Sequence, residues 1–256
     1  MERDLTTGSI GRNILKFSLP YFWSYFLQTL YGMADLFIIG QFNGVASTTA
    51  VSIGSQVMHM ITVMIVGIAM GTTVMIGKSV GAKQKKETSK IIGNTVSLFV
   101  CLSVVLTVVL LFFVHPIVRI MSTPQQAVEG TTVYLTICFA GIPLITAYNI
   151  ISSIFRGLGD SKSPMYFIAV ACGVNIVLDY VFIGGLHFGA SGAALGTTLA
   201  QTISVIVALI AIRKKDTGIS LKRSDLKPEG KTLKNILGIG IPISLQDGFI
   251  QISFIV

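Results

Sequence analysis

Three carboxylates lie inside long apolar stretches of this sequence, where charged side chains are rare. They are Asp35, Asp179 and Asp247, and no Lys or Arg lies deep within these stretches. A charge at the centre of a membrane helix costs about 2.5–3.5 kcal/mol on insertion scales, so each of these acids needs a reason to be there. A carboxylate that faces a cavity can bind a hard cation such as Na⁺, or it can carry a proton. Cation binding is therefore the chemistry that these residue types indicate.

Asp35 shares a predicted helix face with two other polar side chains. Gln28, Tyr31 and Asp35 are spaced i, i+3 and i+7, which places them on one side of a helix. The pattern favours a carboxylate that faces a cavity, with Gln28 and Tyr31 beside it. The alternative is an Asp35 that reaches the outer membrane interface and is simply hydrated.

Asn175 and Asp179 form a second polar pair. Their spacing of four residues places both on one helix face. Asp35 and Asp179 both come late in helices that we expect to rise from the same side, so they can lie at a similar depth. Two carboxylates and an amide offer oxygen ligands for Na⁺, whereas desolvation and repulsion would favour a proton on one carboxyl. The alternative is a polar pair that only holds helices together.

Four further residues have open roles. Thr197 could add a hydroxyl ligand, although a Thr in a membrane helix more often bonds to its own backbone. Pro20 interrupts the backbone hydrogen bonds of its helix and is a candidate hinge. His59 could relay protons or serve as a packing histidine, and Asp247 could line a cavity or be structural.

The sequence contains no pattern that indicates an enzyme. We find no nucleophile–base pair, metal motif or nucleotide fingerprint. The Gly-rich segment 156–164 is predicted to be a turn, because no strand precedes it and the Walker pattern is absent. Cys101, Cys138 and Cys172 lie in apolar runs without metal-ligand spacing. We therefore expect no catalytic residues, no cofactor, and no metal beyond a Na⁺ at the cation site.

The composition is that of an integral membrane protein. Of 256 residues, 52% are hydrophobic and only 12% are charged, and the mean hydropathy is +0.78. About 25% charged residues is typical of a soluble domain. The length and the three Cys exclude a small disulfide scaffold, and the hydrophobicity excludes intrinsic disorder. The net charge of +8 does not indicate nucleic acid, because the basic residues sit in short segments between uncharged runs.

Seven continuous apolar segments are long enough to span a bilayer as helices. A span needs roughly 20 mostly apolar residues, whereas a β-barrel would show short alternating strands. The sequence therefore predicts an all-α membrane protein. The segments are Ile14–Gly40, Ala46–Gly77, Ile91–Val114, Thr132–Leu158, Pro164–Leu186, Ala190–Ile212 and Asn235–Val256.

The distribution of Lys and Arg predicts the orientation. The amino end and the segments after the second, fourth and sixth spans share one side and hold 18 of the 19 basic residues. Only Arg119 lies on the opposite side. The positive-inside rule then places the amino terminus in the cytoplasm. The first span is too long for a cleaved signal and contains Pro20 and Asp35.

An internal repeat predicts a second unit. Segment 12–20 resembles segment 234–242, at an offset of 222 residues, with Asn, Ile, Leu and Pro in matching places. Six spans separate the copies, so both enter the membrane from the same side, as in a parallel repeat. We expect a six-helix lobe at 1–212, a cytoplasmic linker at 213–234, and the first helix of a truncated second lobe at 235–256. Without its partner helices, this last helix is expected to be poorly fixed.

Several motifs together resemble the multidrug and toxic compound extrusion (MATE) family of prokaryotic transporters. The resemblance covers the chain as the amino-terminal half. It rests on Pro20, 33–35 with 39–40, 155–160 with Pro164, 175–179 and 192–197. The family implies twelve helices in two lobes and drug export against a flow of Na⁺ or H⁺. Its prokaryotic members imply a location in the inner membrane of a bacterial or archaeal cell. It also implies that Asp35, Asn175, Asp179 and Thr197 form the cation site, that Gln28 lines the cavity, and that the first helix bends at Pro20.

Three functions remain in competition. The first is a cation-coupled multidrug antiporter with alternating access, whose partners are amphipathic cationic small molecules, the bilayer and the missing carboxy-terminal lobe. The second is a flippase for lipid-linked sugars from the same superfamily, whose pyrophosphate cargo would need basic residues in the cavity. The buried charges are acidic and favour cationic cargo. The third is a fragment without transport of its own.

Overall fold

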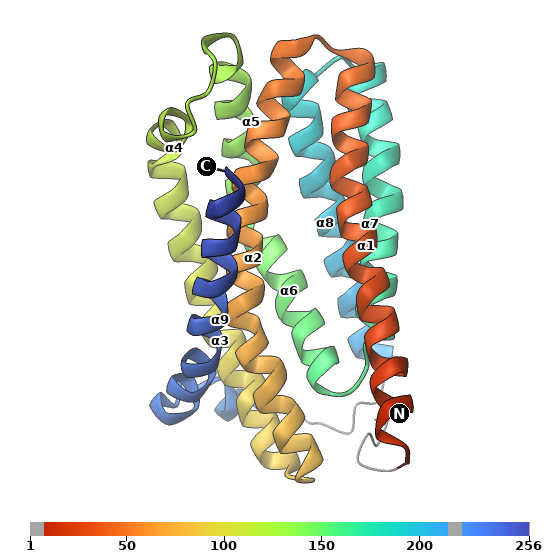
Figure 1. Cartoon of the computed structure of the whole chain (residues 1–256). Coiled ribbons are helices and arrows are strands. Elements are labelled where there is room, and N and C mark those ends of the chain that lie inside the picture. Colours follow the sequence, from red (N-terminus) through yellow and green to blue (C-terminus); the bar gives the residue numbers. More distant parts are fainter. Residues whose placement is uncertain (1–7, 215–221, 256) are drawn as a thin grey trace.

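The chain folds into a bundle of long helices that run roughly along a common axis (Figure 1). The computed structural model describes residues 8–214 and 222–255. Arg3 and Lys215, which were counted among the basic residues of the cytoplasmic side, lie outside the described part. The helices of the described residues are α1 (Ile10–Phe42), α2 (Val45–Gly81), α3 (Lys85–Phe112), α4 (Val114–Ile120), α5 (Val128–Ala140), α6 (Ile142–Gly157), α7 (Lys162–Asp179), α8 (Gly189–Lys214) and α9 (Gly230–Ile255). Short helical turns occur at Gln125–Ala127, Tyr180–Gly185 and Arg223–Leu226.

The predicted spans correspond closely to these helices. By length and composition, five described helices can cross a membrane, or six if a bent pair counts as one span. The 33-residue α1 is not among them, because residues such as Lys16, Gln28 and Asp35 lower its apolarity. It nevertheless packs along α7 over the height of the bundle (Figure 1). We therefore treat α1 as the first of the predicted spans.

The fourth predicted span, 132–158, is not one straight helix. It consists of α5 and α6, which meet at Gly141 with a bend of 50°. Pro143 lies in the first turn of α6 and has no N–H to continue the hydrogen bonding of α5. A Cβ at Gly141 would lie 2.8 Å from Thr198 Cγ2, so the glycine allows the bend to rest against α8. By contrast, α1 stays helical through Pro20.

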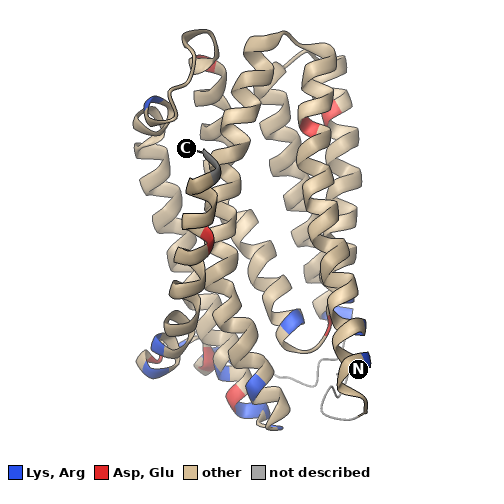
Figure 2. Cartoon of the chain, in the orientation of Figure 1, with Lys and Arg blue, Asp and Glu red and all other residues tan. Residues whose placement is uncertain are grey.

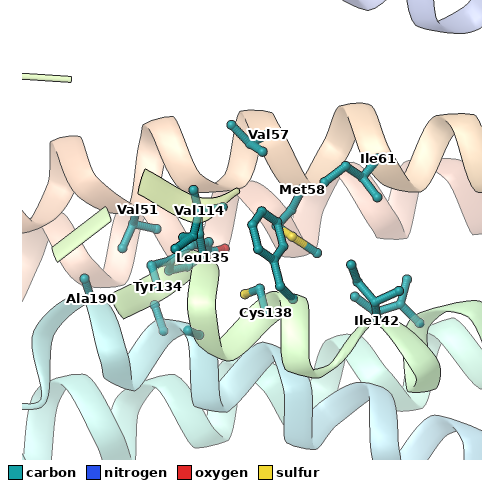
Figure 3. Packing of buried hydrophobic residues seen from close by; sticks show 14 of the residues in the cluster. Val51, Val57, Met58, Ile61, Val114, Tyr134, Leu135, Cys138, Ile142 and Ala190 are labelled. Atoms are coloured by element: carbon teal, nitrogen blue, oxygen red, sulfur yellow. The ribbon is translucent and has the colours of Figure 1, made fainter. Parts of the chain in front are cut away.

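The core lies between α2, α5 and α8. Figure 3 shows Val51, Met58 and Ile61 of α2 facing Tyr134, Leu135 and Cys138 of α5, and all of these side chains are buried. Cys138 thus packs as predicted from its apolar surroundings. Large apolar side chains such as Phe37 and Phe112 are exposed on the outside of the bundle, where a bilayer would cover them.

Basic residues gather at one end of the bundle, near the amino terminus, which we call the basic end (Figure 2). The loop between α2 and α3 contributes Lys83, the first turn of α3 contributes Lys85, and the segment before α9 contributes Lys222 and Arg223. Arg119 belongs to α4, near the opposite end. This is the asymmetry expected from the sequence, and the assignment of the basic end to the cytoplasm stays a prediction.

The last helix is not loosely attached, which corrects the expectation of a poorly fixed helix. Glycines on both helices let α9 lie directly against α2: a Cβ at Gly67 or Gly71 would overlap the backbone of Ser244 or Ile236. A Cβ at Gly240 would likewise overlap the backbone of Ile68. Small residues allow helix backbones to approach closely in membranes. Helix α2 therefore offers α9 a closely fitting surface.

Candidate functional site

The sequence-predicted cation ligands come together between α1, α7 and α8, which lie side by side in Figure 1. Asp35 and Asp179 are neighbours, and Asn175 lies beside them. Thr197 Oγ1 donates a hydrogen bond to Asp35 Oδ2 at 3.2 Å. Asp35 is 3% exposed, and Asn175 and Asp179 are fully buried. The alternative of a hydrated Asp35 at the membrane interface therefore does not agree with the structure.

Most polar atoms of this group have no partner in the protein. Asp35 Oδ1, both oxygens of Asp179 and both amide atoms of Asn175 are buried without a hydrogen bond. Neither carboxylate pairs with a basic side chain of the described residues. The one salt bridge among those residues joins Lys90 and Glu229. Buried charges without a counter-charge are costly. Carboxylate, amide and hydroxyl oxygens are a donor set suited to a hard cation.

A glycine allows the close packing of this group, and the sequence analysis did not single it out. A Cβ at Gly196 would overlap Asp179 Oδ1 and would lie 3.7 Å from Asn175 Nδ2. The absence of a side chain at Gly196 therefore lets α8 press directly on the polar pair of α7. The π-helical turn Tyr180–Gly185 follows Asp179 immediately, and such turns are frequent at functional sites.

The three other predicted site residues lie in different places along α1. Tyr31 is next to both Asp35 and Thr197, but it does not line the cavity that lies between α1, α2, α6 and α9. Gln28 does line that cavity. Pro20 is buried in the amino-terminal third of α1, and its carbonyl accepts a hydrogen bond from Ser24 Oγ at 2.9 Å. The proposed cation site and the cavity thus adjoin along one face of α1.

That cavity has a volume of about 310 Å³. His59 and Asp247, whose roles the sequence left open, both line it. Sequence reasoning missed Tyr21, Tyr148 and Arg156, which also line it. The sequence analysis placed Arg156 only in a predicted turn. In the structure it is the second-last residue of α6, and nothing in the sequence indicated the direction of its side chain.

The sequence model of a protein family described as MatE matches residues 20–181 of the chain. The chain belongs to the MATE family. This confirms the resemblance and the all-helical membrane class, and it assigns the chain to a family of transporters rather than of enzymes.

A relative from Bacillus subtilis (strain 168), described as "Probable multidrug resistance protein YpnP", is 31% identical over 244 residues, which are 95% of this chain and 54% of the relative. The outward-facing structure of a multidrug resistance MATE transporter of the MOP superfamily is 30% identical, with a TM-score of 0.89 over 96% of this chain and 55% of that one. The inward-facing structure is 31% identical, with a TM-score of 0.82 over 89% of this chain and 52% of that one. This MATE chain spans about half the length of its relatives.

Proposed function

We propose that this chain is the amino-terminal lobe of a cation-coupled multidrug antiporter that works by alternating access when a second lobe is present. One observation carries the proposal: two buried carboxylates, Asp35 and Asp179, lie together with Asn175 and Thr197 and have no positive partner. Such a site is at its most stable when it holds a cation or a proton. Inward movement of that cation would supply the energy for export.

The positions of the cation site and the cavity support a coupling between cation binding and substrate binding. The cavity lies where the lobe meets α9, the predicted first helix of the second lobe, and repeat-built transporters bind substrate at this kind of interface. α1 connects the two places, since Gln28 lines the cavity and Asp35 belongs to the cation site. Binding or loss of a cation at Asp35 would change the charge next to α1, and Pro20 is the proposed hinge of this helix.

The chemistry of the site allows either coupling ion. Na⁺ would use the carboxylate oxygens with the neutral oxygens of Asn175 and Thr197. A proton would neutralise one of the two neighbouring carboxylates. We propose Na⁺ or H⁺, and the experiment below separates them by imposing one gradient at a time.

The flippase alternative has less support. A pyrophosphate head group carries several negative charges and would need several basic partners. Among the described residues that line the cavity, the charged groups are Arg156 and Asp247, besides His59. One guanidinium opposed by one carboxylate does not suit a pyrophosphate.

The experiment is efflux of a fluorescent organic cation from proteoliposomes by this lobe joined to the second lobe of a MATE relative. An imposed Na⁺ or pH gradient should drive efflux, and Asp35→Asn or Asp179→Asn should abolish it while membrane insertion stays normal, because a neutral amide does not balance a cation. Glu129→Gln, an acid outside the site, is the control and should keep full activity.

The 256-residue chain alone should bind but not transport, because one lobe cannot rock against another. Gradient-driven efflux that persists in both Asp35→Asn and Asp179→Asn would overturn the site assignment. Saturable transport by the lobe alone would overturn the assignment of transport to a two-lobe assembly.

A further inference from the structure

The segment before α9, residues 222–229, lies against the first turns of α3. A Cβ at Gly93 would overlap the backbone carbonyl of Asp225, so this glycine leaves room for the segment. One turn further along α3, Ser97 Oγ donates a hydrogen bond to the carbonyl oxygen of Leu226. The segment is therefore fixed to α3 through its backbone, which leaves its side chains available for other contacts.

These contacts set the depth of the segment relative to a bilayer. The apolar run of α3 begins at Ile91, and Ser97 lies six residues further, roughly 9 Å along the helix axis. Beyond that point α3 exposes apolar side chains such as Val100 and Val104, which the hydrocarbon core would cover. The head-group region adds roughly 5–7 Å on each side of that core. The segment therefore lies at head-group depth, and the exposed side chain of Leu226 lies at the edge of the hydrocarbon.

Basic residues predominate where the segment meets α3. Residues 84–90 and 222–234 together contain eight basic residues and three acids. All eight basic residues are exposed, and Figure 2 shows several of them beside the start of α9. Lys90 alone among them forms a salt bridge within the described residues. We call this group the linker surface; it consists of Lys85, Lys86, Lys90, Lys222, Arg223, Lys227, Lys231 and Lys234.

Two of the three acids are bound to partners inside the protein. Asp225 Oδ2 accepts a hydrogen bond from the N–H of Lys222 at 2.9 Å. Glu229 Oε2 accepts from Thr232 Oγ1 at 3.0 Å and pairs with Lys90 at 3.9 Å. The third acid lies in the first turn of α3. Most of the positive charge of the linker surface is therefore not neutralised by the protein.

We propose that the linker surface binds the phosphate groups of anionic phospholipids. Clusters of four to eight basic residues next to a membrane helix are typical of such binding, and Lys and Arg both bind phosphate. A phospholipid suits both parts of the surface, because its head group lies level with the basic side chains while its acyl chains reach Leu226. A soluble anion would contact the charges alone. The inference goes beyond the proposed function and does not depend on the coupling ion.

Quenching of a single tryptophan by brominated lipids tests the proposal at this place in the molecule. Trp23 is the one tryptophan of the sequence, so Leu226→Trp in a Trp23→Phe background reports on the linker surface alone. The 256-residue chain is reconstituted in mixed bilayers of phosphatidylcholine and phosphatidylglycerol, and each lipid in turn carries bromine on its acyl chains. At low salt we expect phosphatidylglycerol to bind about tenfold more strongly than phosphatidylcholine. At about 1 M NaCl, where charges are screened within about 3 Å, most of this preference should disappear.

Variants separate the linker surface from the general charge of the basic end. Replacing Lys222, Arg223 and Lys227 together by Gln should reduce the preference to within about twofold. Lys222→Arg with Lys227→Arg keeps the charge and should keep the preference. The matched control removes three basic residues from α1 and α7, on the other side of the basic end (Figure 1), and should retain most of the preference; its changes are Arg12→Gln, Lys16→Gln and Lys162→Gln.

The proposal is overturned if neither brominated lipid quenches the introduced tryptophan, if the two lipids quench it equally, or if the control variant loses the preference as fully as the triple variant. Inorganic phosphate should act no more strongly than NaCl at equal ionic strength. Selective displacement of phosphatidylglycerol by phosphate would assign the surface to a soluble anion instead. Thermal unfolding identifies a triple variant that fails to fold, and the salt dependence of the unmodified linker surface then decides.

Discussion

At the scale of single residues, the candidate cation site depends on a few close contacts. Asp35 and Asp179 are buried next to each other, and Thr197 donates to Asp35. Helical spacing predicted which side chains share a face, and the family resemblance predicted that Thr197 would join them. Neither indicated Gly196, because a glycine has no side chain to suggest a role. Its importance appears only when Asp179 is seen to occupy the space that a Cβ would fill.

Gly196→Ala should therefore disrupt the site without removing any ligand. The new methyl group would displace the Asp179 carboxylate, and we expect cation affinity to fall about tenfold, equivalent to about 1.4 kcal/mol. The matched control is Gly173→Ala on α7, where a Cβ would meet no atom within 4 Å. Binding of radioactive Na⁺, or proton uptake, measures the effect. Equal affinity in the two variants would show that Gly196 does not position Asp179.

At the scale of elements, the segment before α9 is attached to α3. Asn94 is 2% exposed and uses both ends of its amide: Oδ1 accepts from the Glu229 N–H at 2.6 Å, and Nδ2 donates to the Asp225 carbonyl at 3.4 Å. Lys90 adds an ion pair with Glu229 at 3.9 Å. The linker that was predicted at 213–234 is therefore partly a docked segment, and its packing fixes where α9 begins.

Asn94→Leu should release this segment. Two backbone groups would lose their partners, at a cost of about 1–3 kcal/mol, so tryptic cleavage at Lys222 and Arg223 should become about tenfold faster. Gln84→Ala is the amide control, since Gln84 is exposed and its side chain forms no cap hydrogen bond. An unchanged cleavage rate in Asn94→Leu would mean that these contacts do not hold the segment.

The sequence predicted long elements better than their interruptions and contacts. Apolar length located the spans, because continuous hydrophobicity is needed wherever a helix crosses lipid. At the 50° bend, Pro143 interrupts the helical hydrogen bonding, but the size of the bend depends on the contact between Gly141 and Thr198, which the sequence does not show. The attachment of α9 was predicted wrongly, since it comes from glycines on α2 and α9 that only fit when the helices are paired. The cavity position of Arg156 depends on how α1 and α6 pack, which helical spacing does not reveal.

At the scale of the whole molecule, the charge distribution makes the orientation testable. Cysteines introduced at Asn43 and Gly185, in the connections at the end opposite the basic end, should react with impermeant thiol reagents from outside the cell. A cysteine at Gln84, at the basic end, should react only after permeabilisation. The background lacks the three native cysteines. Labelling of Gln84 in intact cells would reverse the predicted orientation.

The most direct test of the central claim is cation binding by the lobe itself. Purified chain in nanodiscs should either bind radioactive Na⁺ saturably or take up one proton more than the Asp35→Asn variant. Asp35→Asn and Asp179→Asn should each abolish that binding, because each removes half of the carboxylate pair, whereas Glu129→Gln should bind like the unmodified chain. If the unmodified chain shows neither saturable Na⁺ binding nor extra proton uptake relative to both variants, the carboxylate pair is not a cation site.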